Sequence, residues 1–165
     1  MELELILGPN GSGKSLFAES EAVASGGSPV YLATMVPQTE DNFRRIEKHR
    51  RQRADKGFRT VERGWDLAAV AVTAAETVLL EDASNLLANG IFAHGAAGDE
   101  ALRQILALAR RCKKLVVVSI EGLPEADYDG ETAAYIRALN DLNDALAAQS
   151  AAVFRMERGV PIRIR

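Results

Sequence analysis

The chain has 165 residues, of which 47% are hydrophobic and 26% charged, and its net charge is -3. These averages exclude a disordered, fibrous or low-complexity protein, and the negative charge argues against a protein that coats nucleic acid. The single cysteine, Cys112, predicts a protein with no disulfide and no cysteine-built metal site. The N-terminus is acidic and no apolar run approaches about 18 residues, so we expect a cytoplasmic protein with no membrane span.

Apolar runs alternate with helical patterns and indicate a single α/β domain over residues 1–165. The predicted strands are residues 3–7, 30–33, 59–61, 77–81, 115–119, 152–156 and 161–164. The predicted helices are residues 15–24, 39–55, 66–75, 100–114 and 132–149. The alternation predicts a mostly parallel sheet covered by helices on both faces, and the last two strands predict an antiparallel hairpin around Arg158 and Gly159.

A glycine-rich loop joins the first strand to the first helix and fits the P-loop pattern G-x-x-x-x-G-K-[ST]. Its residues are Gly8, Pro9, Asn10, Gly11, Ser12, Gly13, Lys14 and Ser15. Such a loop turns backbone N–H groups toward a phosphate at the helix N-terminus, where Lys14 reaches the β- and γ-phosphates and Ser15 binds Mg²⁺. The alternative is a strand-to-helix turn without a ligand. The position favours nucleotide binding and a P-loop NTPase-like three-layer sandwich.

Two acidic residues, Glu81 and Asp82, follow the apolar strand at residues 77–81. A P-loop site needs a carboxylate near its metal ion at the end of such a strand, and we predict Glu81 as that Mg²⁺ ligand together with Ser15. The alternative is an ordinary strand end, with Asp82 or Ser84 capping the next helix.

A basic segment at residues 44–63 has a net charge of +6, whereas the rest of the chain has -9. Within the predicted helix at 39–55, Arg45, His49 and Arg53 are spaced by four and share one face. His49 is a candidate general acid or phosphate-attacking nucleophile. The alternative is a solvated charged helix. The other histidine, His94, lies in a predicted loop of small residues without supporting neighbours.

Short motifs in a fixed order resemble the bifunctional adenosylcobinamide kinase/adenosylcobinamide-phosphate guanylyltransferase family of cobalamin biosynthesis. They are the P-loop, the Y-L-A-T run at 31–34, R-I-E-K-H at 45–49, R-T-V-E at 59–62, L-L-E at 79–81 with Asn89, and the tail motifs at 142–143, 152–153 and 159–162. The resemblance covers nearly the whole chain and is clearest in the first ninety residues.

The resemblance implies that a nucleoside triphosphate, GTP or ATP, phosphorylates adenosylcobinamide. It further implies that His49 attacks GTP and passes GMP to the cobinamide phosphate. Lys14 would act in catalysis, Mg²⁺ would be the cofactor, and the protein would be a homotrimer with a corrinoid substrate. The implied nucleotide contacts outside the P-loop are Thr34, Arg45, Arg53, Glu62 and Glu81.

Residues 119–131 depart from the family pattern, in the region expected to hold the corrinoid or to order the loop over it. Two other functions therefore remain alternatives to the corrinoid transferase. One is a P-loop small-molecule kinase with a non-corrinoid acceptor, and the other is a non-catalytic nucleotide-binding regulatory protein.

Overall fold

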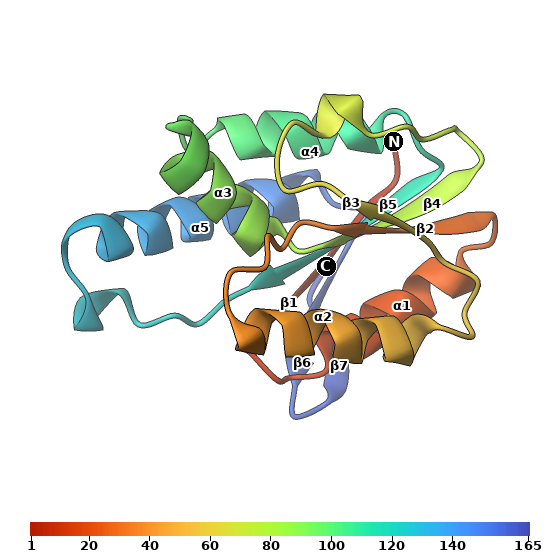
Figure 1. Ribbon diagram of the computed structural model, residues 1–165, viewed down its shortest axis with the longest axis horizontal. Helices are drawn as coiled ribbons and strands as arrows, with labels where there is room; N and C mark the ends of the chain where they lie inside the picture. The colour runs from red at the N-terminus through yellow and green to blue at the C-terminus, as the bar shows by residue number, and fades with distance from the viewer.

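The computed structural model describes residues 1–165 as a seven-stranded sheet between two layers of helices (Figure 1). The strands are β1 (Leu3–Gly8), β2 (Ser28–Ala33), β3 (Arg59–Glu62), β4 (Glu76–Glu81), β5 (Lys114–Ile120), β6 (Ala152–Glu157) and β7 (Val160–Arg163). Their order is β3-β2-β4-β5-β1-β6-β7, and all neighbours are parallel except β6 and β7. The predicted α/β sandwich with a C-terminal antiparallel hairpin is confirmed.

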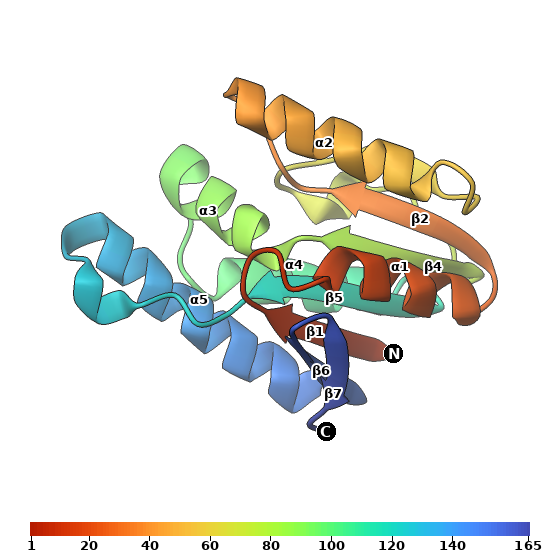
Figure 2. The ribbon, with the colours of Figure 1, turned by 90° about the horizontal axis from the view of Figure 1, so that it is seen from below.

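Helices α1 (Lys14–Ala24) and α2 (Glu40–Arg53) lie on one face of the sheet, and α3 (Ala83–His94), α4 (Glu100–Ala109) and α5 (Gly130–Gln149) on the other (Figures 1 and 2). Successive side chains of β1 point to opposite faces of the sheet and so pack against both layers of helices. Leu5 and Leu7 pack in the larger core with α3, α4 and α5, whereas Ile6 packs with Ala18 and Ala22 of α1. No helix combines the length and apolar character that crossing a membrane requires.

The helix predicted at residues 66–75 is wrong, because only a 3₁₀ turn at Leu67–Ala69 forms there. Asp66 has a left-handed φ of 56°, and side chains take over the backbone groups of the segment: Gln104 accepts from the Leu67 N–H at 2.9 Å, and Arg111 donates to the Leu67 carbonyl at 2.8 Å. A chain held in this way cannot continue a helical hydrogen-bond pattern.

Two further helix boundaries differ from prediction. The helix predicted to reach residue 114 ends at Ala109, because β5 begins at Lys114 and needs a turn before it. The loop predicted around His94 is instead the last turn of α3, which ends at Gly95 in the left-handed region (φ 59°).

The carboxyl ends of the parallel strands meet at one edge of the sheet. Gly8 of β1, Ile120 of β5, Glu81 of β4, Ala33 of β2 and Glu62 of β3 end there in that spatial order. Ligands of open α/β sheets bind at this edge, so the topology alone gathers the residues singled out from the sequence.

Candidate active site

The P-loop has the geometry of an anion-binding turn. Gly11 and Gly13 have φ angles of 72° and 89°, and Gly13 directly precedes α1. A Cβ on Gly8 would lie 2.6 Å from Ser12 Oγ and 3.1 Å from Met156 Cβ, so a side chain at the first position of the loop would displace its neighbours. Because these glycines let the backbone N–H groups and the N-terminus of α1 converge, the loop can cradle phosphate oxygens.

Lys14 lies inside the P-loop, with only 7% of its surface exposed. Its Nζ donates to the carbonyl of Pro9 at 2.7 Å. Burial lowers the pKa of Lys14, and the carboxylates of Asp82 and Glu81 oppose that effect by favouring the charged form. The ammonium is therefore held beside the loop where a phosphate would lie.

Ser15 and Glu81 meet across the site, with Ser15 Oγ donating to Glu81 Oε1 at 2.5 Å. Glu81 Oε2 is buried and has no hydrogen-bond partner. Burial, together with the neighbouring Asp82 carboxylate, raises the pKa of Glu81 to about 8, against the opposing effects of Ser15 and Lys14. A hydroxyl and a buried carboxylate oxygen without a partner are donors that suit a hard cation such as Mg²⁺.

Asp82 caps α3, as the alternative interpretation of this residue anticipated. Its Oδ1 accepts from the N–H of Asn85 at 2.7 Å. The hydroxyl of Thr34, which is fully buried, accepts from the Asp82 N–H at 2.8 Å and donates to the Asp82 carbonyl at 2.7 Å. Thr34 therefore holds the end of β4 in place, and its hydroxyl is engaged with backbone rather than directed into a cavity.

Two cavities lie along this edge of the sheet. The P-loop cavity, of about 590 Å³, is bounded by the loop, the start of α1 and the α2 face. The second cavity, of about 440 Å³, lies between α2 and the ends of β2 and β3 and includes apolar side chains. Four residues line both cavities: Arg45, His49, Glu81 and Asp82. His49 therefore stands at the boundary between the phosphate loop and the second cavity.

The surroundings of the His49 imidazole favour its neutral form. Its Nδ1 is buried without a hydrogen-bond partner. Burial lowers the pKa of His49; Glu19 opposes this, whereas the cationic side chains of Arg45 and Arg53 reinforce it. Because the pKa is below its usual value, the ring stays neutral at neutral pH and keeps a lone pair available.

The basic residues of α2 divide into fixed and free groups. The Arg53 guanidinium lies 3.7 Å from the centre of the Tyr31 ring and, with 6% exposure, forms the floor of the second cavity. Arg50 is paired with Glu62 at 2.7 Å on the cavity's rim. Arg45 is exposed, lines both cavities and has no ion-pair partner in the protein.

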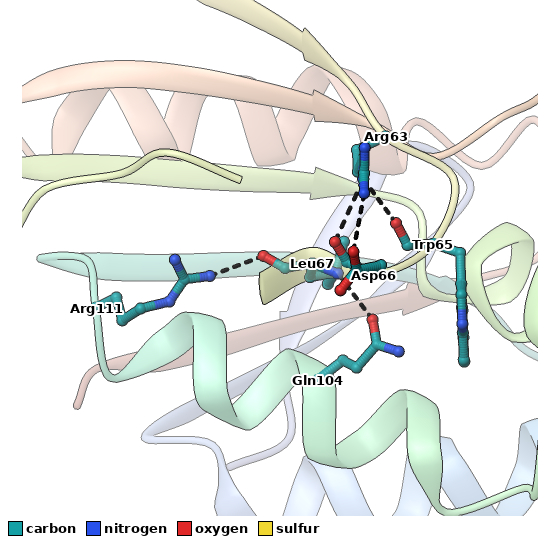
Figure 3. A network of polar contacts seen from close by, with 6 residues as sticks. All are labelled: Arg63, Trp65, Asp66, Leu67, Gln104 and Arg111. Carbon is teal, nitrogen blue, oxygen red and sulfur yellow. Dashed lines mark hydrogen bonds and ion pairs between the residues drawn. The ribbon is translucent and has the colours of Figure 1, made fainter. Parts of the chain in front are cut away.

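A third cavity, of about 630 Å³, adjoins the second at Glu62 and was not foreseen from the sequence. Trp65 stacks on His94 there at 5.8 Å, so His94 has a neighbour after all. Arg63 holds the loop that carries Trp65: it donates to the Trp65 carbonyl at 2.9 Å and pairs with Asp66 at 2.9 Å (Figure 3). The cavity could not be foreseen, because Trp65 and His94 meet only in the folded chain, and Asn89, which donates to the Gly64 carbonyl at 2.9 Å, also lies far from this loop in the sequence.

Fold and site together define a P-loop nucleotide-binding α/β protein. Among solved structures the chain is similar to an ATPase domain, with a TM-score of 0.51 and 7% identity over 93% of this chain and 68% of that one, a likeness of fold. A family model described as cobinamide kinase / cobinamide phosphate guanyltransferase matches residues 4–164. The chain belongs to this family, whose members are nucleotide-using transferases of cobalamin biosynthesis. No curated protein matches the sequence.

Proposed function

We propose that the protein carries out both transfers of its family at the shared edge of the sheet, with His49 as the covalent nucleophile. The observation that carries the proposal is the position of His49, which lines the P-loop cavity with Lys14 and also lines the second cavity. A triphosphate held by the loop then lies next to a neutral imidazole, and an attached nucleoside has a partly apolar cavity beside it.

In guanylyl transfer, a ring nitrogen of His49 attacks the α-phosphorus of GTP. An N–P bond forms, the bond between the α-phosphorus and the bridging oxygen breaks, and pyrophosphate leaves from the P-loop. A terminal phosphate oxygen of adenosylcobinamide phosphate then attacks the same phosphorus. The new P–O–P linkage forms as the N–P bond breaks, which returns His49 to its neutral state.

In phosphoryl transfer, the aminopropanol hydroxyl of adenosylcobinamide attacks the γ-phosphorus of GTP or ATP. The O–P bond forms, the β–γ bridge breaks and the nucleoside diphosphate leaves. Lys14 stabilises the charge that develops on the phosphates, and Asp82, which lines both cavities, accepts the hydroxyl proton. Arg45 faces both cavities without a protein partner and serves as a second phosphate contact in either transfer.

Mg²⁺ fits the donors present at this site. Ser15 Oγ and the unpartnered Oε2 of Glu81 would hold it, with the nucleotide's phosphates completing the coordination. When bound, the ion neutralises phosphate charge in both transfers. The homotrimer and the cytoplasmic location rest on family resemblance and composition, and sedimentation of the purified protein tests the former.

A kinase with a non-corrinoid acceptor remains the second candidate. The observation that favours it is the segment from Glu121 to Asp129, which departs from the family pattern and forms a loop with a single 3₁₀ turn at Glu125–Asp127. This loop follows β5 at the same edge as the P-loop, where an acceptor would approach.

The proposal is tested by incubating the protein with Mg²⁺ and α-labelled GTP, followed by denaturing electrophoresis. We expect an acid-labile label on the wild type, no label on His49→Ala, and full label on the matched control His94→Ala. A wild type that takes no label under any condition would overturn covalent guanylylation. Label from γ-labelled nucleotide alone would favour a different phosphotransfer, and phosphorylation of a non-corrinoid alcohol in preference to adenosylcobinamide would favour the second candidate.

A further inference from the structure

A fully buried carboxylate lies beneath the helix that carries His49. Glu19 is on α1, four residues after Ser15, and has 0% of its surface exposed. Residues four apart on a helix share a face, so the P-loop serine and this glutamate point to the same side of α1. Neither the P-loop nor the proposed transfers use Glu19, and an ionised carboxylate without partners in that position would be strongly unfavourable.

Both oxygens of Glu19 accept hydrogen bonds, one from the end of α2 and one from the turn that follows it. Gln52 Nε2 donates to Oε1 at 2.9 Å, and Lys56 Nζ donates to Oε2 at 2.6 Å. Gln52 is three residues after His49 on the same helix, and Lys56 lies in the turn that follows. The two contacts therefore clamp the chain immediately after the nucleophile onto the helix that begins with the phosphate loop.

The side-chain contacts that join α2 to the strands also lie in its C-terminal half. Arg53 packs on Tyr31, and Arg50 pairs with Glu62 on the exposed rim. In contrast, the ion pairs of Arg44 in the first turns join it to residues of α2 itself. The contacts of Gln52 and Lys56 with Glu19 are the ones that join the end of α2 to α1. Because α1 begins at the P-loop, these contacts set the position of His49 relative to that loop.

We propose that Glu19 is a positioning residue for guanylyl transfer, which holds Gln52 and Lys56 so that His49 stays at the boundary between the P-loop cavity and the second cavity. The inference rests on the proposed role of His49. A nucleophile must lie in line with the α-phosphorus, and a displacement of about 1 Å costs up to roughly a hundredfold in rate. Glu19 makes no contact with the reacting atoms in this arrangement and acts through the helix.

The charge of Glu19 also reaches His49. The ionisable groups around the imidazole, on the elements packed around the two cavities, are Glu19 and Lys14 of α1, Arg45, Lys48 and Arg53 of α2, and Glu81 and Asp82 at the end of β4. The Glu19 carboxylate raises the pKa of His49 against the effect of burial, whereas the three cations of α2 lower it. Removing that carboxylate therefore lowers the pKa of His49 and shifts the acid limb of its reaction to lower pH.

The test compares Glu19→Gln with Glu21→Gln, a charge-matched control two residues along α1. We expect Glu19→Gln to slow GMP labelling by about tenfold, to shift the acid limb to lower pH and to leave GTP binding within about twofold. Glu21→Gln should label as the wild type does. The double variant Glu19→Gln/Lys56→Met removes both charges, so no lysine is left without its partner. It should also take up the GMP label slowly.

Two readouts do not depend on labelling. NMR titration gives the pKa of His49, and hydrogen exchange reports how firmly the last turns of α2 are held. In Glu19→Gln we expect a lower His49 pKa and exchange about tenfold faster at residues 49–53. The positioning role is overturned if neither NMR readout changes in Glu19→Gln. It is also overturned if the wild type takes up label and Glu19→Gln does so at the same rate and with the same pH profile. If the wild type does not label while both NMR readouts shift, the clamp is supported and the covalent chemistry is what fails.

Discussion

The P-loop and helix α2 meet at one edge of the sheet but are held there by different means. The loop grows out of β1, all of whose residues are buried, and its geometry is set by backbone and glycines. Helix α2 has one buried residue among fourteen and is attached through polar and charged side chains of its C-terminal half and of the turn after it. The phosphate-binding half is thus fixed by the fold itself, whereas the position of the nucleophile depends on a few side-chain contacts that single substitutions can remove.

The largest effect is expected where the P-loop loses its one charged side chain, Lys14. Lys14→Ala should reduce both phosphoryl and guanylyl transfer by at least about a thousandfold, because the charge on the transferred phosphates loses its fixed cation. Initial rates with saturating nucleotide measure this. Lys113→Ala, at an exposed lysine that donates only to the Ser25 carbonyl, is the control and should be active. Wild-type rates in Lys14→Ala would remove the P-loop from the chemistry.

Glu81→Gln should lower the catalytic activity but raise the free energy of unfolding. The variant therefore distinguishes the catalytic role of a residue beside the P-loop from its effect on stability. The pKa of Glu81 is raised from about 4.5 in the unfolded chain to about 8 in the folded protein. Between these values the folded state binds one more proton than the unfolded state, so stability falls as pH rises through this window. Removing the group should stabilise the protein by on the order of 4 kcal/mol at pH 8.5 and by little at pH 4.

Denaturant unfolding of the wild type and Glu81→Gln at pH 4, 6 and 8.5 measures this difference in the free energy of unfolding, in the absence of nucleotide and Mg²⁺. Equal stability of the two proteins at every pH would show that the buried carboxylate carries no cost. Asp141→Asn, at an exposed position on α5, is the control and should follow the wild type at all three pH values.

Arg53→Ala tests the attachment of α2 to the sheet. The variant loses the cation–π contact with Tyr31 and the 3.3 Å hydrogen bond to Thr60 Oγ1. We expect a loss of about 2 kcal/mol in the free energy of unfolding and slower GMP labelling, with phosphate binding at the loop retained. Arg53→Lys should recover only part of the loss, since an ammonium cannot stack as a guanidinium does. An unchanged labelling rate would show that α2 is held well enough without Arg53.

Arg44→Ala should have the smallest effect. Arg44 pairs with Glu40 and Asp41 within α2, and its side chain is 70% exposed. Exposed pairs of this kind contribute at most a few tenths of a kcal/mol, so the thermal midpoint and the labelling rate should both stay at wild-type values. A large loss of labelling would mean that the outer turns of α2 contact the substrate, so that the position of His49 would not depend on the C-terminal half of the helix alone.

The strands were predictable because they are uninterrupted apolar runs, and the P-loop because backbone chemistry imposes a pattern on sequence. Helix α3 was harder to foresee, since Asn89 and Gly90 interrupt its apolar pattern. Both have tertiary roles: Asn89 donates to the carbonyls of Thr34 and Gly64, and a Cβ on Gly90 would lie 2.4 Å from the Trp65 ring. Helix propensity depends on the local sequence, so it could not predict residues whose contacts are with segments distant along the chain.

For the site, spacing alone placed Arg45, His49 and Arg53 on one face of a helix. In the structure all three line the second cavity, and Arg45 and His49 also line the P-loop cavity. The role of Glu19 was hidden, because a glutamate in an ordinary helical position carries no local signal of burial. Its partners, Gln52 and Lys56, lie more than thirty residues away. Long-range pairs of this kind are visible only once the helices are placed side by side.

The C-terminal hairpin bears on how the protein is made. The Gly159 backbone lies 3.6 Å from where a Cβ on Gly13 would sit, and Leu5 of β1 pairs with Val117 on one side and Val153 on the other. During translation the first strand therefore emerges long before either of its neighbours. The surroundings of the phosphate loop are therefore complete only after contacts between residues more than a hundred positions apart have formed, and contacts this distant along the chain slow folding.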